Sequence, residues 1–331
     1  MKLCIVGPYP PPYGGVSNHI CRLLPYLSES NIQYNVFNQY DVEDRELGVK
    51  STRGSYVWWL KFLFIKEKHL VHFHQFSWFH FIYFFVYSVV NKNDFIITIH
   101  NEKLLNAPAW IRFLAVSLLR WSRFRKLLVV SKSVETMLIH AGVDNVCYLP
   151  AYVPPRVSSK SSRDVDGKTI FFNIWKVSCV GDISRYGIDL LMVLALKYPG
   201  VRFECFIAVD ENINLIESVI KDKGAFNLIL RIGENLVEHF YRADVFLRLN
   251  RDDAYGISIQ EAMDCGVPAI ASDVCARPDG VKLFKSGNID ELLAVFDEVL
   301  SSPKNILLQG KVDMEYHLQL IGLYKKLLAE K

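Results

Sequence analysis

The sequence predicts an α/β protein built on two doubly wound parallel sheets. Short apolar runs alternate with stretches of helical spacing in both halves of the chain. That alternation produces right-handed crossovers between parallel strands, with helices covering both faces of each sheet. The length of 331 residues suits two cores rather than one. A Pro- and Ser-rich stretch, residues 150–160, separates the two alternating patterns and marks the expected hinge between domains.

The first half begins with an apolar run that stops at Gly7, before a Pro/Gly loop. Its strands are expected where short apolar runs occur, of which FIITI at residues 95–99 is the richest in β-branched side chains. Its helices are expected where apolar residues recur every three or four positions. The expected strands are residues 3–6, 35–38, 70–74, 95–99, 126–130 and 145–149, and the expected helices are residues 15–27, 77–90, 108–124 and 133–141.

The second half repeats this order. Gly266 and Pro268 end one helix and start the next strand, as those residue types do. The expected strands are residues 169–174, 202–207, 227–232, 245–249 and 268–271, and the expected helices are residues 188–197, 214–221, 236–243, 258–265, 289–300 and 314–329. We therefore expect a first domain over residues 1–155, a second over residues 156–312, and a last helix in residues 313–331 that returns to the first domain.

Composition excludes several classes of protein. The net charge is +3, and no basic run with interleaved aromatic residues is present, so a nucleic-acid partner is not expected. The seven cysteines are odd in number and include no C-x-x-C pair, which is typical of reduced thiols in a cytoplasmic protein. The N-terminus lacks the pattern of a signal peptide. Residues 77–90 are uncharged but shorter than the roughly 20 residues that span a bilayer.

The loop after the first strand, GPYPPPYGG, leads into a helix. Gly14 and Gly15 remove side chains where the helix begins, and free N–H groups there suit an anion. The loop matches neither the G-x-G-x-x-G pattern of dinucleotide binding nor a P-loop. A plain tight turn is the alternative interpretation.

The segment NRDDAYGISIQEAMDCGVPAIASD, residues 250–273, carries two acids eight positions apart. Asp253 is expected at the end of a strand, and Glu261 within the following helix. Glu261 is flanked by apolar residues, so it lies near a buried face and needs hydrogen-bond partners. The two hydroxyls of a ribose would be suitable donors. The alternatives are an ion-paired helix residue for Glu261 and an ordinary loop acid for Asp253.

The segments PYPPPYGGVSNH and DDAYGISIQEAMDCGVPAIASDV resemble the retaining glycosyltransferases of family 4. The resemblance implies the GT-B fold, in which two Rossmann-like domains face a cleft. It implies transfer of a hexose from a nucleoside-diphosphate sugar without a metal or other cofactor. It also implies a polyprenyl-linked glycan acceptor, in the synthesis of a surface polysaccharide such as lipopolysaccharide O-antigen or capsule, at the inner face of the cytoplasmic membrane.

The same resemblance implies roles for individual residues. Glu261 would hold the ribose hydroxyls of the donor, and Asp253 would contact hydroxyls of the transferred sugar. His100, at the end of FIITI, would lie beside that sugar, and His19 would support the glycine loop. The backbone of Gly256, Ile257 and Ser258 would approach the diphosphate, while Gly14 and Gly15 would close over donor and acceptor.

One stretch departs from the family pattern G-R-x4-K-G, which neutralises the diphosphate. GDISRYG, residues 181–187, is one residue shorter, and Asp182 stands where the arginine is expected. Arg185 or Lys176 would have to substitute. The departure favours an alternative function, a nucleotide-sugar-binding subunit with little or no transfer activity. A third hypothesis, a dinucleotide oxidoreductase, conflicts with the absence of G-x-G-x-x-G.

His72 and His74 lie on one face of an expected strand, and His80 follows. A metal site is one interpretation of this spacing. No carboxylate with fitting spacing lies nearby, which favours packed histidines and no metal.

The segment from Pro108 to Lys126 combines apolar residues with basic ones. It contains tryptophans and phenylalanines, five Lys or Arg residues, and no acid. Such a helix would lie in an anionic membrane surface. The alternative is a buried crossover helix whose last-turn cations offset the helix dipole.

Overall fold

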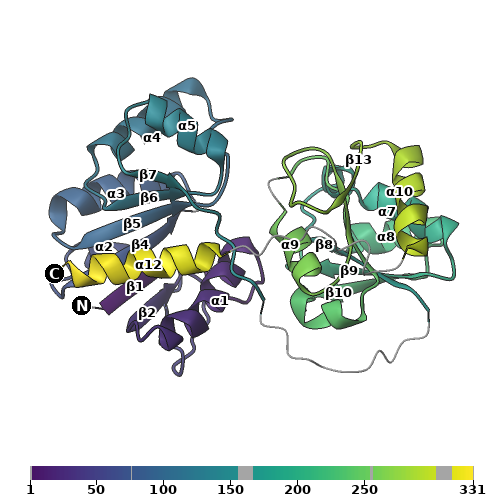
Figure 1. The fold of residues 1–331 in the computed structure, drawn as a ribbon, viewed down its shortest axis with the longest axis horizontal. Coiled ribbons are helices and arrows are strands. Elements are labelled where there is room, and N and C mark those ends of the chain that lie inside the picture. The colour runs from purple at the N-terminus through teal and green to yellow at the C-terminus, as the bar shows by residue number, and fades with distance from the viewer. Residues whose placement is uncertain (1, 76, 156–166, 254–255, 303–314, 331) are drawn as a thin grey trace. The chain divides into compact units, whose positions relative to one another are not determined.

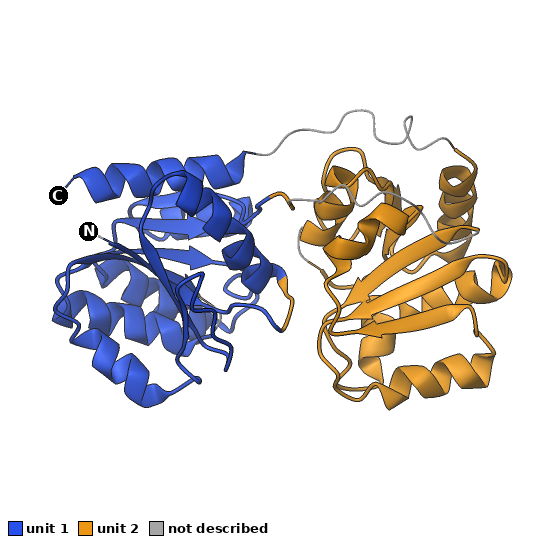
Figure 2. Ribbon diagram, turned by 90° about the horizontal axis from the view of Figure 1, so that it is seen from below, with its two compact units in different colours: residues 1–11, 15–153, 314–331 blue, residues 12–14, 154–313 orange. Residues whose placement is uncertain are grey.

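The computed structural model describes residues 2–75, 77–155, 167–253, 256–302 and 315–330 (Figure 1). The chain divides into two compact units (Figure 2). Unit 1 consists of residues 1–11, 15–153 and 314–331, and unit 2 consists of residues 12–14 and 154–313. Residues 156–160 of the expected hinge, and the expected domain boundaries at residues 156 and 312–313, lie outside the described residues.

Unit 1 contains a seven-stranded parallel sheet with the strand order β3-β2-β1-β4-β5-β6-β7. Its strands are β1 (Lys2–Gly7), β2 (Tyr34–Asn38), β3 (Val49–Ser51), β4 (His69–Gln75), β5 (Asp94–Ile99), β6 (Lys126–Val129) and β7 (Val146–Tyr148). The central strand β1 is buried at every position after Lys2. Strands buried on both faces form near-continuous apolar runs of this kind.

Helices cover both faces of this sheet. They are α1 (Gly15–Glu29), α2 (Tyr56–Leu63), α3 (Phe79–Val90), α4 (Ala109–Trp121), α5 (Lys132–His140) and α12 (Tyr316–Ala329). Because side chains alternate along a strand, β1 contributes to two cores. Leu3 and Ile5 pack with α1 and α12, and Cys4 and Val6 pack with α2 to α5. The last helix, α12, therefore completes the core of unit 1 (Figure 1).

Unit 2 contains a six-stranded parallel sheet with the order β10-β9-β8-β11-β12-β13. Its strands are β8 (Thr169–Ile174), β9 (Arg202–Ile207), β10 (Leu228–Ile232), β11 (Val245–Arg248), β12 (Ala269–Ser272) and β13 (Lys282–Phe284). Its helices are α6 (Gly181–Tyr186), α7 (Ile188–Lys197), α8 (Asn214–Lys223), α9 (Ile257–Asp264), α10 (Ile289–Ser301) and the 3-10 helix η1 (Leu236–Arg242). Phe172 packs with α7, α8 and α10, whereas Phe171 packs with α9 and η1.

The predicted fold class is confirmed: both sheets are parallel and covered by helices on both faces.

Four short elements were not predicted, namely β3, α2, α6 and β13. Three-residue strands such as β3 are too short to show a pattern, and the aromatic run of α2, YVWWLKFL, has no clear helical spacing. The segment predicted as an α-helix at residues 236–243 forms the 3-10 helix η1 instead.

In the parts of the chain that the structure describes, no helix is both long enough and apolar enough to cross a bilayer.

Candidate active site

The candidate donor site of unit 2 lies where α9 begins. Gly256 immediately precedes the helix with φ 78°, a left-handed conformation that glycine adopts without strain. A Cβ atom at Gly256 would also come within 2.8 Å of Arg277 Nη1. Ile257 and Ser258 form the start of α9, and the Ser258 hydroxyl lies 3.3 Å from Asn173 Oδ1 on β8. The first turn of α9 is thereby fixed against the sheet.

Glu261 lies one turn further along α9 and is 4% exposed. Its neighbours Ile259 and Ala262 are fully buried. A carboxylate is placed in such surroundings only when hydrogen bonds compensate its lost hydration. The position of Glu261 near the buried face is the one that the sequence indicated; its role toward a ribose stays a prediction.

Asp253 is held by two arginines. Arg248, at the end of β11, donates from Nε to Asp253 Oδ2 at 2.8 Å and from Nη2 to Oδ1 at 2.7 Å. Arg277 donates from Nη1 to Oδ2 at 2.6 Å. Burial raises the pKa of the Asp253 carboxyl, but the two guanidinium groups outweigh it and hold the pKa below its ordinary value. Asp253 is therefore ionised and fixed in place.

Sequence reasoning missed both arginines. Arg248 is the last residue of the otherwise apolar strand VFLR, and a cation at the end of a buried strand is a signal for a paired acid. Arg277 lies 24 residues from Asp253 in the sequence, so spacing alone does not indicate their pairing.

The two cations expected to replace the missing arginine are already paired with acids. Arg185 lies 3.5 Å from Asp182 and 3.4 Å from Asp252. Lys176 donates to Glu211 at 2.6 Å. Both cations are thus neutralised by their neighbours.

Asp182, at the position where the family pattern has arginine, has a structural function. Its Oδ2 accepts hydrogen bonds from the backbone N–H groups of Ser178 at 2.8 Å and Cys179 at 3.3 Å. These two hydrogen bonds fix the turn that leads into α6.

His100 belongs to unit 1, where it follows β5 and is partly buried. Its Nε2 lies 2.7 Å from His74 Nδ1, and the two rings stack with centroids 4.9 Å apart. The ring centroids of His19 and His100 lie 5.8 Å apart, and those of His72 and His74 lie 4.3 Å apart. Burial, the largest effect, lowers the pKa of all four groups. The four side chains form a neutral histidine cluster at pH 7.

The histidine cluster does not form a metal site in the described residues, because no three His, Cys, Asp or Glu side chains there are arranged to hold an ion. His72 instead hydrogen-bonds Tyr324 of α12 at 2.5 Å and Thr98 of β5 at 2.7 Å. His80 lies on α3 against Trp59, with ring centroids 5.2 Å apart. The histidines therefore join α12 and α1 to the sheet.

The two loop glycines differ in what surrounds them. A Cβ at Gly14, which belongs to unit 2, would come within 2.7 Å of Trp175 Cζ3. Gly15 is the first residue of α1, and a Cβ there would meet no atom within 4 Å. A side chain at position 14 would therefore have to displace the Trp175 ring, whereas position 15 has open space.

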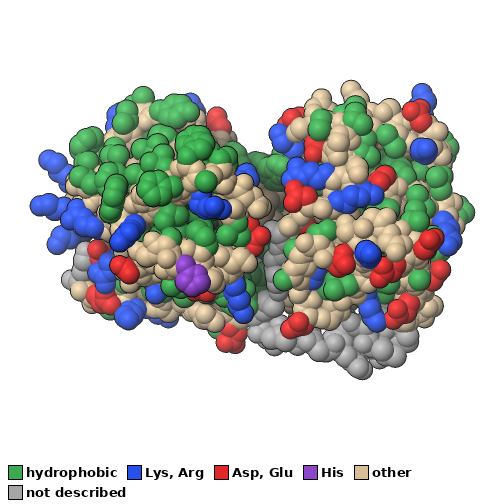
Figure 3. Space-filling model, turned by 90° about the horizontal axis from the view of Figure 1, so that it is seen from above, with side chains coloured by type: hydrophobic (Ala, Val, Ile, Leu, Met, Phe, Trp, Pro, Cys, Tyr) green, Lys and Arg blue, Asp and Glu red, His purple; other side chains and the backbone are tan. Residues whose placement is uncertain are grey.

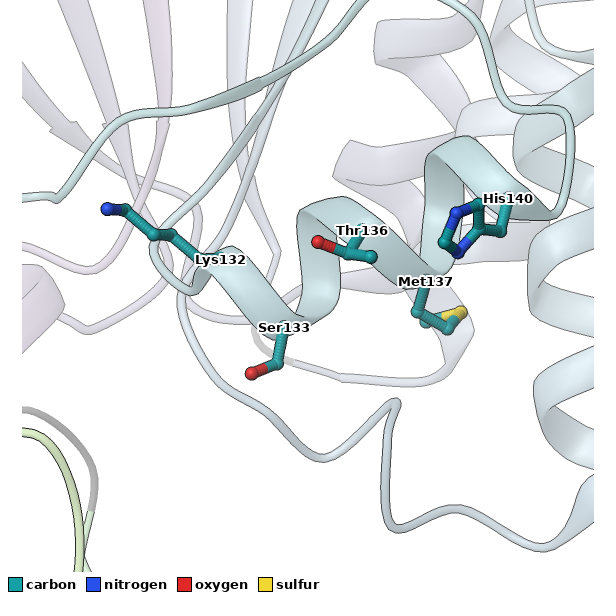
Figure 4. Close-up of a pocket in the computed structure, with 5 residues that line it drawn as sticks. All are labelled: Lys132, Ser133, Thr136, Met137 and His140. Atoms are coloured by element: carbon teal, nitrogen blue, oxygen red, sulfur yellow. The ribbon is translucent and has the colours of Figure 1, made fainter.

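A depression on the surface of unit 1 contains none of the predicted site residues. It runs along α5 and is lined by Lys132, Ser133, Thr136, Met137 and His140 (Figure 4). Its lining comes from one face of one helix, so it offers no set of converging groups and gives no basis for a site.

Comparison with known proteins supports the fold. Residues 215–306 match the model of the family "Glycosyl transferases group 1". The structure of HepE from Anabaena in complex with UDP-glucose matches with a TM-score of 0.72 and 13% identity, covering 100% of both chains. Sucrose-phosphate synthase from Thermosynechococcus elongatus matches with a TM-score of 0.72 and 14% identity, also covering 100% of both chains.

The lipopolysaccharide outer core galactosyltransferase WaaB, in its apo form, matches with a TM-score of 0.62 and 14% identity, covering 98% of this chain and 100% of that one. No protein with a curated description matches the sequence. The chain therefore has the two-sheet fold of the GT-B glycosyltransferases, and its residues 215–306 match glycosyl transferases group 1.

Proposed function

We propose that this protein is a retaining glycosyltransferase that moves a hexose from a nucleoside-diphosphate sugar to a glycan acceptor. The observation that carries the proposal is the buried carboxylate of Glu261 on α9, one turn after the Gly256 backbone. It lies within the segment that matches the glycosyltransferase family, on a GT-B fold. An ionised carboxylate accepts only, so two hydroxyls of a ribose would be matching donors.

The start of α9 would receive the donor's diphosphate. The first N–H groups of a helix have no partner within the helix, and the helix dipole favours negative charge there. The glycine at position 256 is explained by its left-handed backbone and by packing, because a Cβ atom there would lie 2.8 Å from both Arg277 Nη1 and Ile259 Cδ1. The nucleoside would then lie toward Glu261 and the sugar toward the opposite end of the diphosphate.

In the proposed reaction the acceptor hydroxyl attacks the anomeric carbon on the face from which the diphosphate leaves. A bond forms between the acceptor oxygen and the anomeric carbon, and the bond from that carbon to the diphosphate oxygen breaks. The acceptor's proton passes to the departing phosphate oxygen. The protein would contribute positioning and charge stabilisation, with no divalent metal in the reaction, so transfer should persist in EDTA.

His100 would act on the sugar as a neutral group. Burial lowers its pKa well below the ordinary value, so its imidazole carries no charge at pH 7. A neutral imidazole has one donor and one acceptor nitrogen. His74 is hydrogen-bonded to the Nε2 atom, which fixes the ring. The Nδ1 atom would then be the one that meets a sugar hydroxyl.

For the acceptor we propose a polyprenyl-linked glycan of surface polysaccharide synthesis, met at the inner face of the cytoplasmic membrane. The segment from Pro108 to Lys126, which contains α4, would contact the membrane. Its support is the exposure of Trp110, Phe113 and Trp121 at 70%, 75% and 67%. Apolar patches this exposed are rare on monomeric proteins unless they bind something.

The exposed apolar surface continues from α4 onto α3 and α2. The Tyr56 ring of α2 lies 6.3 Å from the Phe79 ring of α3. Further exposed apolar residues on these two helices are Val57, Leu60, Ile82, Val89 and Val90. Figure 3 shows one face of unit 1 with many hydrophobic side chains and with Lys and Arg along its outer margin. Basic residues beside an apolar face would favour anionic lipids.

A nucleotide-sugar-binding subunit without transfer activity is the second candidate. The observation that favours it is the pairing of Arg185 and Lys176 with acids. A diphosphate that is poorly neutralised would be a poor leaving group.

A thermal-shift series with UDP, GDP, ADP and their sugars tests the proposal. A ligand at 100 times its Kd adds about 2.7 kcal/mol of stability. The Glu261→Ala variant should lose that shift, whereas Glu217→Ala, an exposed acid on α8, should keep it. Incorporation of labelled sugar into a lipid extract then separates the two candidates. A shift without incorporation supports the binding subunit, and no shift with any nucleotide refutes both.

A further inference from the structure

We propose that His74 is a positioning residue that fixes the tautomer of His100, so that His100 meets the transferred sugar as a hydrogen-bond donor. In this arrangement His74 donates from Nδ1 to His100 Nε2, and His100 carries its own hydrogen on Nδ1. The identity of the ligand as a sugar rests on the function proposed above. The tautomer itself rests on the geometry of unit 1 alone.

The two histidines are joined by a short hydrogen bond. His74 Nδ1 lies 2.7 Å from His100 Nε2, the ring centroids are 4.9 Å apart, and the ring planes differ by 21°. Both rings are neutral at pH 7, because burial lowers the pKa of each well below its ordinary value. A neutral imidazole has one donor nitrogen and one acceptor nitrogen. One ring of the pair therefore donates, and the other accepts.

Packing holds His74 in place. Its side chain is 1% exposed and lies on the face of β4 that also carries His72, whose ring centroid is 4.3 Å away. A Cβ atom at Gly7, on the neighbouring strand β1, would come within 3.0 Å of His74 Cβ. His100 follows the end of β5 and is only partly buried. The buried ring therefore orients the more accessible one.

The other nitrogen of His74 decides which ring donates. Nε2 is buried and has no hydrogen-bond partner in the part of the chain that the structure describes. If His74 accepted at Nδ1, its hydrogen would be on Nε2, and a buried N–H group would lack an acceptor. Buried backbone N–H groups are left without acceptors more rarely than carbonyl groups are left short of donors. The same preference places the hydrogen of His74 on Nδ1, where His100 accepts it.

The neighbouring His19, on α1, has its hydrogen placed in the same way. Its ring centroid lies 5.6 Å from that of His74, and its Nδ1 atom is also buried without a partner among the described residues. The hydrogen bond of His19 with the Ala151 backbone therefore involves Nε2. Burial lowers the pKa of His19 to about 4, and this hydrogen bond opposes the effect, as a bond to a carbonyl acceptor does. His19 thus donates from Nε2, and its unpartnered nitrogen is the bare one.

The tautomer determines what His100 recognises. With its hydrogen on Nδ1, His100 would donate to an oxygen of the transferred sugar, in a hydroxyl, an ether or a carboxylate. With a bare Nδ1 it would need a donor from the sugar instead. The first tautomer therefore disfavours a sugar with a protonated amino group at the contacted carbon, because two donors would face each other.

Long-range proton–nitrogen NMR of the full chain, with isotope-labelled histidine, measures the tautomer directly. Protonated and bare ring nitrogens differ widely in chemical shift. The signals of His74 and His100 are assigned from His74→Asn and His100→Asn, each of which removes one ring. We expect the hydrogen on Nδ1 in both rings of the wild type at pH 7. A His100 ring that carries its hydrogen mainly on Nε2 would overturn the proposal.

Two substitutions at position 74 separate the hydrogen bond from packing. The amide of asparagine is attached at the same point of the side chain as Nδ1, so His74→Asn keeps a donor for His100 Nε2 and should keep the tautomer. His74→Gln moves the amide one bond further out. It should release His100 into a mixture of tautomers and lower kcat/KM about tenfold, the effect of losing one hydrogen bond. A His74→Gln variant with the tautomer and kcat/KM of the wild type would contradict the proposal.

His72→Gln is the matched control. His72 is as deeply buried as His74, two positions earlier on β4, and its nitrogens hydrogen-bond Tyr324 and Thr98 rather than His100. The same substitution there should lower Tm but leave the His100 tautomer and kcat/KM unchanged. If His72→Gln changed the tautomer as much as His74→Gln does, general packing rather than the hydrogen bond would fix His100, and the proposal would fail.

These results are distinct from failure of the proposed function. An Nδ1-protonated His100 that depends on His74, in a protein that transfers no sugar, retains the positioning of His100 and refutes the transferase. Sugar transfer by a protein in which His100 carries its hydrogen on Nε2 refutes the positioning by His74 alone.

Discussion

Lowering the pH from 7 to 5 should destabilise unit 1 through its buried histidines. His72 and His74 are at most 1% exposed, and His19 is 5% exposed. Burial lowers the pKa of His19 to about 4 and that of His72 to about 3, and it holds His74 and His100 well below the ordinary value. Unfolding would return these rings to water, where histidine has a pKa of about 6.5.

The direction and size of the effect follow from that difference. Above pH 6.5 both states are neutral, and the histidines add no pH dependence. As the pH falls below 6.5 the unfolded chain binds protons and the folded chain does not, so stability is lost until the folded pKa is reached. At pH 5 this amounts to about 2 kcal/mol for each histidine. His19 and His72 alone would then remove about 4 kcal/mol, a large share of a typical 5–15 kcal/mol.

Urea unfolding followed by tryptophan fluorescence at pH 7, 6 and 5 measures this loss. Five of the six tryptophans lie in unit 1, so the signal reports mainly on that unit. His72→Gln cannot titrate and should reduce the loss between pH 7 and pH 5 by about 2 kcal/mol. His140→Gln, at an exposed position on α5, should leave it unchanged. Equal unfolding free energies of the wild type at pH 7 and pH 5 would refute the reasoning.

Three further substitutions test the packing and the surface. Gly187 has φ 79°, and a Cβ atom there would collide with the backbone carbonyl oxygen of Leu249. Gly187→Ala should therefore lower the free energy of unfolding in urea by about 2 kcal/mol or more. The control Gly200→Ala, where a Cβ atom would meet open space, should change it by less than about 0.5 kcal/mol. Tyr324→Phe removes the hydroxyl that hydrogen-bonds His72 and should lower the free energy of unfolding by about 1–3 kcal/mol. An unchanged midpoint of urea unfolding would argue against that hydrogen bond. Trp110→Ser should lower the affinity for anionic vesicles, measured by co-sedimentation, about tenfold, because burying a large apolar side chain contributes about 1.5–3 kcal/mol. Undiminished vesicle binding would exclude this surface as the membrane contact.

The fold class was predictable because the same sequence pattern, a short apolar run followed by a stretch of helical spacing, is repeated along the chain. Each βα unit contributes an apolar run and a periodic stretch, and two sheets contain enough such units for an error in one of them to matter little. The elements that escaped prediction are those whose identity depends on neighbours. The three residues of β13 form a strand because β12 offers a parallel edge to pair with.

The candidate site was predictable only where its residues are close in sequence. The spacing from Asp253 to Glu261 places one before α9 and the other within it, because both positions follow from a single helix start. The arginine pair depends on the sheet instead. In the register of β11 and β12, Arg248 lies beside Ala271, and the chain that leaves β12 carries Arg277 back to Asp253. A sequence does not contain this register in any local pattern.

The arginine pair also limits what Asp253 offers a sugar. A carboxylate has about four acceptor positions on its two oxygens. Three are occupied, by Nε and Nη2 of Arg248 and by Nη1 of Arg277. Within the part of the chain that the structure describes, this leaves one position for a hydroxyl, whereas a glutamate free of such bonds would offer several. If Asp253 both holds the arginines and contacts the transferred hexose, the two roles share one anchored carboxylate. Any shift of Arg248 would then also move the group that orients the sugar, so the position of this arginine and that of the sugar would be coupled through one side chain.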